Sequence, residues 1–195
     1  SRRQRQMCIR DRPVRKALGI PTIFNTLGPL LSPGRPSLQI MGIANPAQGQ
    51  LIAEVFRELG RKRALVVHGA GTDEIATHGT TQVWELKDGE IATYELTPED
   101  LGIERHELTD LAGDDGAANA RALRAVFAGR GEPAHCDAIA ATAGAMFYLN
   151  GTTETIAAGV THVKELISSG TVEDWLALHE NTNYAVAEEL SLIHI

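Results

Sequence analysis

Residues Ser37 to Glu74 read SLQIMGIANPAQGQLIAEVFRELGRKRALVVHGAGTDE. The run Ser37–Ile43 is mainly apolar and predicts a buried strand, and Asn45-Pro46 supplies a cap and a first-turn proline for a helix that ends at Gly60. Ala64–His68 is short and rich in valine, which is typical of a parallel strand covered on both faces. Strand, helix and strand together predict one right-handed βαβ unit.

A hairpin and a helical half are expected to follow this unit. Thr81–Lys87 and Glu90–Leu96 flank Asp88-Gly89, a dipeptide suited to a tight type I′ turn. Thr97–Asp100 is expected to open a brief helical turn. Beyond Asp115 the chain is rich in alanine and predicts helices over Gly116–Ala128, roughly Cys136–Leu149, Glu154–Ser168 and Val172 to about Asn181. A short strand over Ala138–Ala145 is the alternative to the second helix.

The predicted fold class is therefore α/β. We expect a mainly parallel sheet flanked by helices, with the β-hairpin appended to it and a helical C-terminal half, all in one unit.

Both ends of the chain have the features of an adapter. Leu190–Ile195 (LSLIHI) and Met7–Arg12 (MCIRDR) can be read from opposite strands of one short DNA sequence, which resembles a transposon end used to prepare sequencing libraries. We therefore expect residues 1–12 and 190–195 to be adapter-derived, and residues 13–189 to be an incomplete α/β domain cut from a longer coding sequence. The alternative is a genuine basic N-terminal arm that binds nucleic acid.

The composition of residues 13–189 excludes several classes of protein. Removing residues 1–12 takes away five arginines and one aspartate, which leaves 13 basic and 24 acidic side chains and a formal charge of −11. This balance argues against nucleic acid as a partner. Cys136 is then the one cysteine, so an internal disulfide cannot form and a reducing cytosol fits. No stretch reaches the roughly eighteen apolar residues of a membrane span. We expect a soluble, cytoplasmic protein.

Asp73-Glu74 is the sharpest local signal for chemistry. The two carboxylates lie in a glycine-containing loop directly after the strand predicted at Ala64–His68, and open α/β sheets bind ligands at the carboxyl ends of their strands. Mg²⁺ is commonly held by one or two carboxylates together with substrate phosphates. The alternative is a pair of solvated acids in a surface loop.

Five strings of the chain together resemble the anthranilate phosphoribosyltransferase family. They are VRKALGIPTIFNTLGPLLSP (Val14–Pro33), ALVVHGAGTDE (Ala64–Glu74), TQVWELKDGEI (Thr81–Ile91), LTPEDLGI (Leu96–Ile103) and LAGDDGAANARAL (Leu111–Leu123). The similarity covers nearly all of residues 13–180. It implies a nucleoside phosphorylase/phosphoribosyltransferase-like catalytic domain, and transfer of phosphoribose from phosphoribosyl pyrophosphate to anthranilate in tryptophan biosynthesis.

The resemblance also implies roles for four residues. Arg15 and Pro29 would contact anthranilate, and Asp73 and Glu74 would bind Mg²⁺. A planar guanidinium suits a carboxylate because it donates two parallel hydrogen bonds, although a solvated cation at a helix end is the alternative for Arg15.

The chain departs from the family pattern by absence. Nothing in it corresponds to the family's glycine-rich diphosphate-binding motif or to the N-terminal helical domain that forms most of the family's homodimer contact. We therefore expect the chain itself to be inactive. The alternatives are a pyrimidine nucleoside phosphorylase, a non-catalytic relative that binds nucleic acid, and a folded but inert remnant.

Other reactive side chains are given structural roles. His68 is expected to be a hydrogen-bonded histidine at a strand end, Cys136 a small core residue, and Trp84 and Trp175 packing residues. The remaining histidines considered are too scattered in sequence to propose a metal cluster or a catalytic triad: His78, His106, His135, His162 and His179.

Overall fold

The computed structural model describes residues 30–31 and 34–179. Residues 1–36 and 37–195 form two compact units. The second unit contains every strand described.

The predicted βαβ unit is confirmed. Strand β1 (Leu38–Gly42) leads through a short 3₁₀ helix η1 (Pro46–Gln48) into helix α3 (Gly49–Glu58), and strand β2 (Arg63–Gly69) follows. The side chain of Asn45 accepts a hydrogen bond from the backbone N–H of Ala47 at 3.1 Å, so it caps η1 as expected. Gly60 lies just beyond α3 with a φ of 73°, the left-handed conformation that ends many helices.

The hairpin is also confirmed, but the sheet is mixed. Strands β3 (Thr81–Lys87) and β4 (Glu90–Leu96) are joined by Asp88 and Gly89, whose φ angles of 53° and 83° are both positive, as a type I′ turn requires. The sheet order is β1-β2-β3-β4. Only β1 and β2 pair in parallel; β2 with β3 and β3 with β4 pair antiparallel.

The prediction of a mainly parallel sheet is therefore wrong for the described strands. The hairpin is appended to the sheet as expected, and β3 pairs with β2 along its whole length, from Arg63 opposite Lys87 to Gly69 opposite Thr81. A valine-rich strand covered on both faces has the same apolar pattern whichever way its neighbour runs.

The C-terminal half is helical. After the 3₁₀ turns η2 (Glu99–Leu101) and η3 (Leu108–Leu111), the chain forms α4 (Gly116–Phe127), α5 (Pro133–Leu149) and α6 (Ile156–Ser168). Residues 171–179 are helical as well. The possible strand at Ala138–Ala145 is instead the middle of α5, which is long enough to bury an alanine-rich surface. Within the part of the chain that the structure describes, no helix has both the length and the apolar character needed to cross a bilayer.

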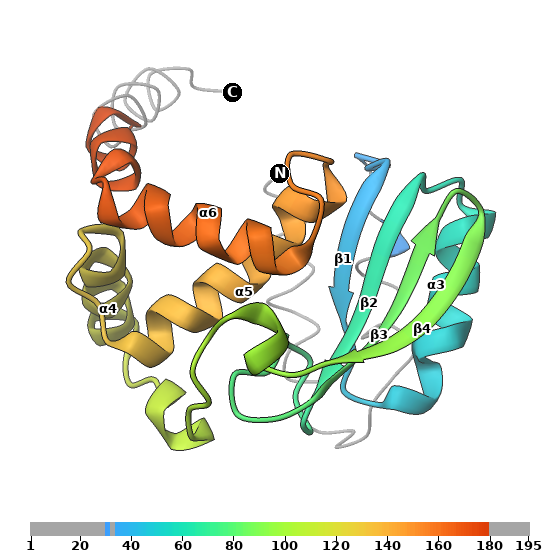
Figure 1. The fold of residues 1–195 in the computed structure, drawn as a ribbon, viewed down its shortest axis with the longest axis horizontal. Helices are drawn as coiled ribbons and strands as arrows, with labels where there is room; N and C mark the ends of the chain where they lie inside the picture. Colours follow the sequence, from blue (N-terminus) through green and yellow to red (C-terminus); the bar gives the residue numbers. More distant parts are fainter. Residues whose placement is uncertain (1–29, 32–33, 180–195) are drawn as a thin grey trace, which may run out of the picture. The chain divides into compact units, whose positions relative to one another are not determined.

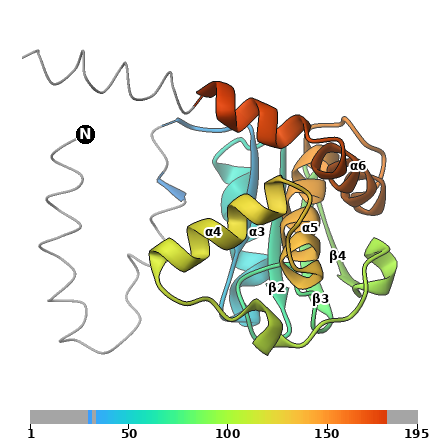
Figure 2. The same cartoon turned by 90° about the vertical axis from the view of Figure 1, so that its left-hand side faces the viewer.

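Helices cover both faces of the sheet (Figures 1 and 2). In Figure 2, α4 and α5 lie in front of the strands and α3 lies behind them. On the α3 side Gly49 lies directly against the indole ring of the buried Trp84. The other face forms the main core, in which Leu65, Val67 and Val83 pack with residues of α5 and α6. The carboxyl ends of β1 and β2 are thus held between helical layers.

Candidate functional site

A tight turn follows β2 and reverses the chain towards the sheet. Gly69 and Thr72 exchange backbone hydrogen bonds of 3.0 and 2.8 Å. The two central residues, Ala70 and Gly71, have φ angles of 45° and 90°, the pattern of a type I′ turn. The hydroxyl of Thr72 donates a further hydrogen bond of 2.7 Å to the carbonyl of Gly69. Asp73 and Glu74 therefore emerge from a turn with fixed backbone geometry.

Two glycines allow this loop to pack on the strand ends. A Cβ on Gly42, the last residue of β1, would lie 1.5 Å from the carbonyl oxygen of Asp73. A Cβ on Gly69, the last residue of β2, would lie 2.4 Å from the carbonyl oxygen of Glu74. Only glycine permits such close backbone approach. The backbone of Asp73 and Glu74 is consequently held against the carboxyl ends of both parallel strands, where the sequence predicted the pair.

Asp73 and Glu74 line one cavity of about 260 Å³, which we call the acidic cavity. Its other walls come from the ends of the two parallel strands, from Ile75, and from Thr142 on α5. Both acidic residues are exposed. The pKa of Glu74 is raised above its ordinary value, first because its carboxyl group is partly desolvated and second because of the charge of Asp73. A bound cation would relieve the repulsion between these two groups.

The donors fit a magnesium ion that is shared with phosphate. Within the described residues no three His, Cys, Asp or Glu side chains gather in a group able to hold a metal ion. Two carboxylates alone are too few for a closed protein site, but they match the usual mode of Mg²⁺, which keeps waters and takes oxygens from substrate phosphates.

Contacts from distant elements hold the segment that follows the loop. The backbone N–H of Ala76 donates to the hydroxyl oxygen of Thr81 at 2.8 Å. The backbone N–H of His106 donates to the carbonyl of Thr77 at 2.9 Å. The imidazole of His106 in turn bonds the buried carboxylate of Asp137 at 2.8 Å. The loop is therefore tied to β3 and, through His106, to α5.

Sequence reasoning missed the His106–Asp137 pair. Asp137 also forms an ion pair of 2.7 Å with Lys164 of α6, so its carboxylate joins three separate segments. His106 and Asp137 are 31 residues apart, and no local motif marks either of them. The one available signal was the single acidic side chain of an alanine-rich helix, which needs a partner when buried.

The structural roles given to the other residues are largely confirmed. The Nδ1 atom of His68 lies 2.8 Å from the carbonyl oxygen of Ile43. Cys136 packs against the core, and burial raises the pKa of its thiol. Trp84 is buried, but Trp175 is 58% exposed and stacks on the ring of His179. The predicted anthranilate contacts Arg15 and Pro29 lie outside the described residues.

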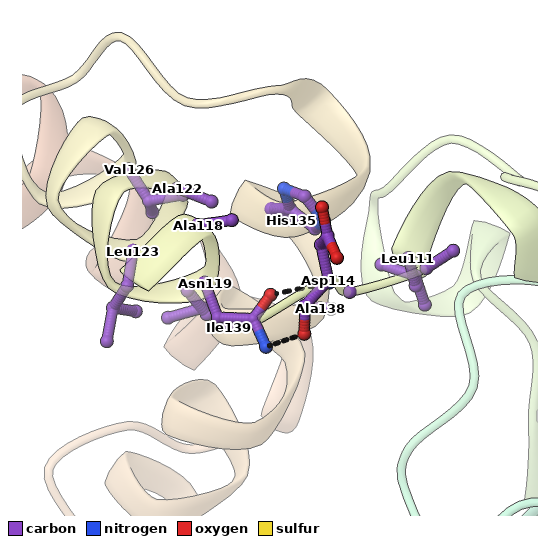
Figure 3. Close-up of a pocket in the computed structure, with 12 residues that line it drawn as sticks. Leu111, Asp114, Ala118, Asn119, Ala122, Leu123, Val126, His135, Ala138 and Ile139 are labelled. Carbon is purple, nitrogen blue, oxygen red and sulfur yellow. Dashed lines mark hydrogen bonds between the residues drawn. The ribbon is translucent and has the colours of Figure 1, made fainter. Parts of the chain in front are cut away.

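A larger pocket of about 380 Å³ lies between α4, α5 and the loop that precedes α4 (Figure 3). Its walls are mostly alanine and larger aliphatic side chains, with His135 among the few polar ones. The side chain of Asn119 is engaged by the backbone of Asp114, with hydrogen bonds of 3.0 and 3.4 Å. This pocket shares no lining residue with the acidic cavity. The larger of the two pockets is therefore not the one that Asp73 and Glu74 line.

Curated relatives with similar sequences are anthranilate phosphoribosyltransferases. That of Corynebacterium aurimucosum is 76% identical over 176 residues, which cover 90% of this chain and 51% of the relative. That of Corynebacterium diphtheriae is 64% identical over 173 residues, covering 89% of this chain and 51% of the relative. The chain thus spans about half the length of the relatives it matches.

Solved structures of the same name share the fold. The anthranilate phosphoribosyltransferase of Thermus thermophilus is 36% identical with a TM-score of 0.77, and the match covers 85% of this chain and 49% of that one. The enzyme of Saccharomyces cerevisiae in complex with PRPP and Mg is 30% identical with a TM-score of 0.75, over 86% of this chain and 48% of that one.

The family-level match covers most of the chain. The model of the glycosyl transferase family, a/b domain, matches residues 6–173, which include every described strand and helices α3 to α6. The predicted α/β class agrees with this match and with the solved structures. The chain therefore belongs to the glycosyl transferase family and carries its a/b domain.

Proposed function

We propose that this chain is the α/β part of an enzyme that transfers phosphoribose from phosphoribosyl pyrophosphate to the amino group of anthranilate, a step of tryptophan biosynthesis. The observation that carries the proposal is the pair Asp73 and Glu74 in one cavity at the carboxyl ends of β1 and β2. It is supported by the relatives' names and by yeast structures with PRPP and Mg and with 4-fluoroanthranilate.

In this proposal the chain's own residues position charge. Asp73 and Glu74 would hold Mg²⁺, which neutralises negative charge on the departing pyrophosphate when it is bound. Gly42 and Gly69 fix the backbone of both acidic residues, so little reorganisation is needed on binding. Holding donor and acceptor in one orientation removes a large entropic part of the barrier, and no covalent intermediate with the protein is required.

The remaining assignments rest on the resemblance. Arg15 would form a two-pronged, charge-assisted pair with the carboxylate of anthranilate, and Pro29 would line the same site. The parent enzyme would be a cytoplasmic homodimer joined through its N-terminal helical domain.

Binding of a divalent ion together with the donor substrate tests the proposal. We expect the chain to bind Mn²⁺, used as a spectroscopic substitute for Mg²⁺, more tightly when phosphoribosyl pyrophosphate is present. Asp73→Asn should weaken this binding by about tenfold or more, because a charge-assisted ligand is lost. Electron paramagnetic resonance of free Mn²⁺ measures both.

Asp88→Asn is the matched control. Asp88 follows β3 at the opposite end of the sheet from Asp73, since Lys87 pairs with Arg63 at the start of β2. It should bind Mn²⁺ as the unmodified chain does. Equal affinity of the Asp73→Asn and Asp88→Asn variants would contradict the proposed site.

A further inference from the structure

The acidic cavity has one wall that comes from the helical half of the chain. Thr142 of α5 lines it together with Asp73 and Glu74. It lies more than sixty positions beyond them in the sequence, and nothing in the local pattern of α5, which is dominated by alanine, marks it as part of a site. Its burial is intermediate, so its side chain is neither fully enclosed nor fully exposed.

The hydroxyl group of Thr142 is uncommitted. Two other polar side chains of α5 have partners, since Asp137 bonds His106 and Tyr148 bonds Glu85. Within residues 30–31 and 34–179, no hydrogen bond engages the Thr142 hydroxyl, not even the back-bond to the preceding turn that Thr161 makes in α6. A hydroxyl can donate and accept, so it complements carboxylates, which in ionised form only accept.

We propose that Thr142 is a substrate-contacting residue whose hydroxyl donates a hydrogen bond to a phosphate oxygen of a metal–diphosphate group held in the acidic cavity. This inference rests on the proposed function, because Asp73 and Glu74 must bring the metal there. The two carboxylates repel the negative diphosphate unless the metal intervenes, and a neutral donor that lines the same cavity binds that anion without adding charge.

Three variants and one probe test the inference. The probe is inorganic pyrophosphate with Mn²⁺, titrated into the 195-residue chain. Thr142→Val keeps the shape and removes the hydroxyl, and Thr142→Ser keeps the hydroxyl. We expect Thr142→Val to weaken pyrophosphate binding about tenfold to a hundredfold, as loss of one hydrogen bond to a charged group predicts. Thr142→Ser should remain within about twofold of the unmodified chain, and Mn²⁺ alone should bind both variants equally.

The outcomes, with Asp73→Asn as the third variant, separate this inference from the proposed function. If Asp73→Asn loses Mn²⁺ while Thr142→Val binds pyrophosphate normally, the role of Thr142 is overturned and the metal site stands. If Asp73→Asn binds Mn²⁺ as before, the metal site fails, and the inference fails with it. A fall in Thr142→Ser equal to that in Thr142→Val would show that shape rather than the hydroxyl matters, which also overturns the role of Thr142. Thermal unfolding of each variant confirms that the fold is retained.

Discussion

Glu74 has a raised pKa, and the causes of this shift predict how one substitution changes the pKa. Desolvation is the larger cause and the charge of Asp73 the smaller. Asp73→Asn removes only the second, so we expect the pKa of Glu74 to fall in that variant but to stay above its ordinary value. Carboxyl-carbon NMR titration measures the change. An unchanged pKa would show that the two side chains do not interact.

The same raised pKa sets the pH dependence of metal binding. A metal ion binds the ionised carboxylate, so protonation of Glu74 competes with it. Affinity for Mn²⁺ should therefore rise with pH through the pKa of Glu74, which lies above the ordinary value of 4.5. The profile should be the same in Asp88→Asn. A flat profile across weakly acidic pH would contradict a role for Glu74 as a ligand.

Local signals predicted part of the site at this scale. Asp73 and Glu74 are adjacent in sequence and follow a strand that its own valines identify, so their location at a sheet edge could be inferred. The places of His106, Asp137 and Thr142 could not be inferred, because the contacts of these residues depend on how α5 packs against the sheet and the loop. Such long-range packing has no counterpart in a short stretch of sequence.

At the scale of elements, the junction of β1 with the acidic loop is the tightest feature of the site. Gly42→Ala would place a methyl group within 1.5 Å of the backbone of Asp73, which cannot move aside as a flexible side chain would. We expect a loss of about 1–3 kcal/mol in the free energy of unfolding, together with weaker Mn²⁺ binding because the loop must shift. Urea denaturation and the Mn²⁺ titration measure the two effects.

Gly116→Ala provides the control for that substitution. Gly116 begins α4 and a Cβ there would meet nothing within 4 Å. It should leave stability unchanged or slightly raised, since alanine favours a helix more than glycine does. If Gly42→Ala were as stable as Gly116→Ala, the close approach of loop and strand would be wrong.

A buried acid links the hairpin to α5. Glu85 of β3 accepts hydrogen bonds from the hydroxyls of Tyr94 at 2.9 Å and Tyr148 at 2.8 Å, and it pairs with Arg63 at 3.4 Å. Burial, followed by the charge of Glu85, raises the pKa of Tyr94 well above its ordinary value of 10.0. The stabilisation from the protonated phenol is complete below about pH 10 and is lost as the pH rises further.

Tyr94→Phe should therefore change stability in a pH-dependent way. Near neutral pH we expect a loss of about 1.5–3 kcal/mol, the usual contribution of a hydrogen bond to a charged group. Above about pH 10 the difference from the unmodified chain should shrink. Urea unfolding at several pH values provides the comparison, and a constant difference across that range would rule out this linkage.

Elements were more predictable than their pairing. Capping residues and turn glycines placed α3, the hairpin and α6 close to their observed bounds, since these signals act within a few residues. The direction of β3 relative to β2 was not predicted, because the apolar pattern of a doubly covered strand says nothing about its neighbour's direction.

At the scale of the whole molecule, the chain spans about half of its relatives. It contains the proposed metal ligands, but no string in it corresponds to the glycine-rich diphosphate-binding motif expected of the family. We expect the chain alone to form no phosphoribosyl anthranilate above the level of its Asp73→Asn variant. A fluorescence assay for that product measures this, and turnover that Asp73→Asn abolishes would contradict the expectation.

The central claim is that Asp73 and Glu74 hold a divalent ion to which a diphosphate binds. Paramagnetic broadening of backbone amide NMR signals by Mn²⁺, in the presence of phosphoribosyl pyrophosphate, tests it most directly because the effect falls steeply with distance. We predict that the strongest broadening affects Gly42 and residues 72–75, and that it disappears in Asp73→Asn. Broadening centred on another acidic segment, such as Asp114-Asp115, with Gly42 and residues 72–75 unaffected, would contradict the claim.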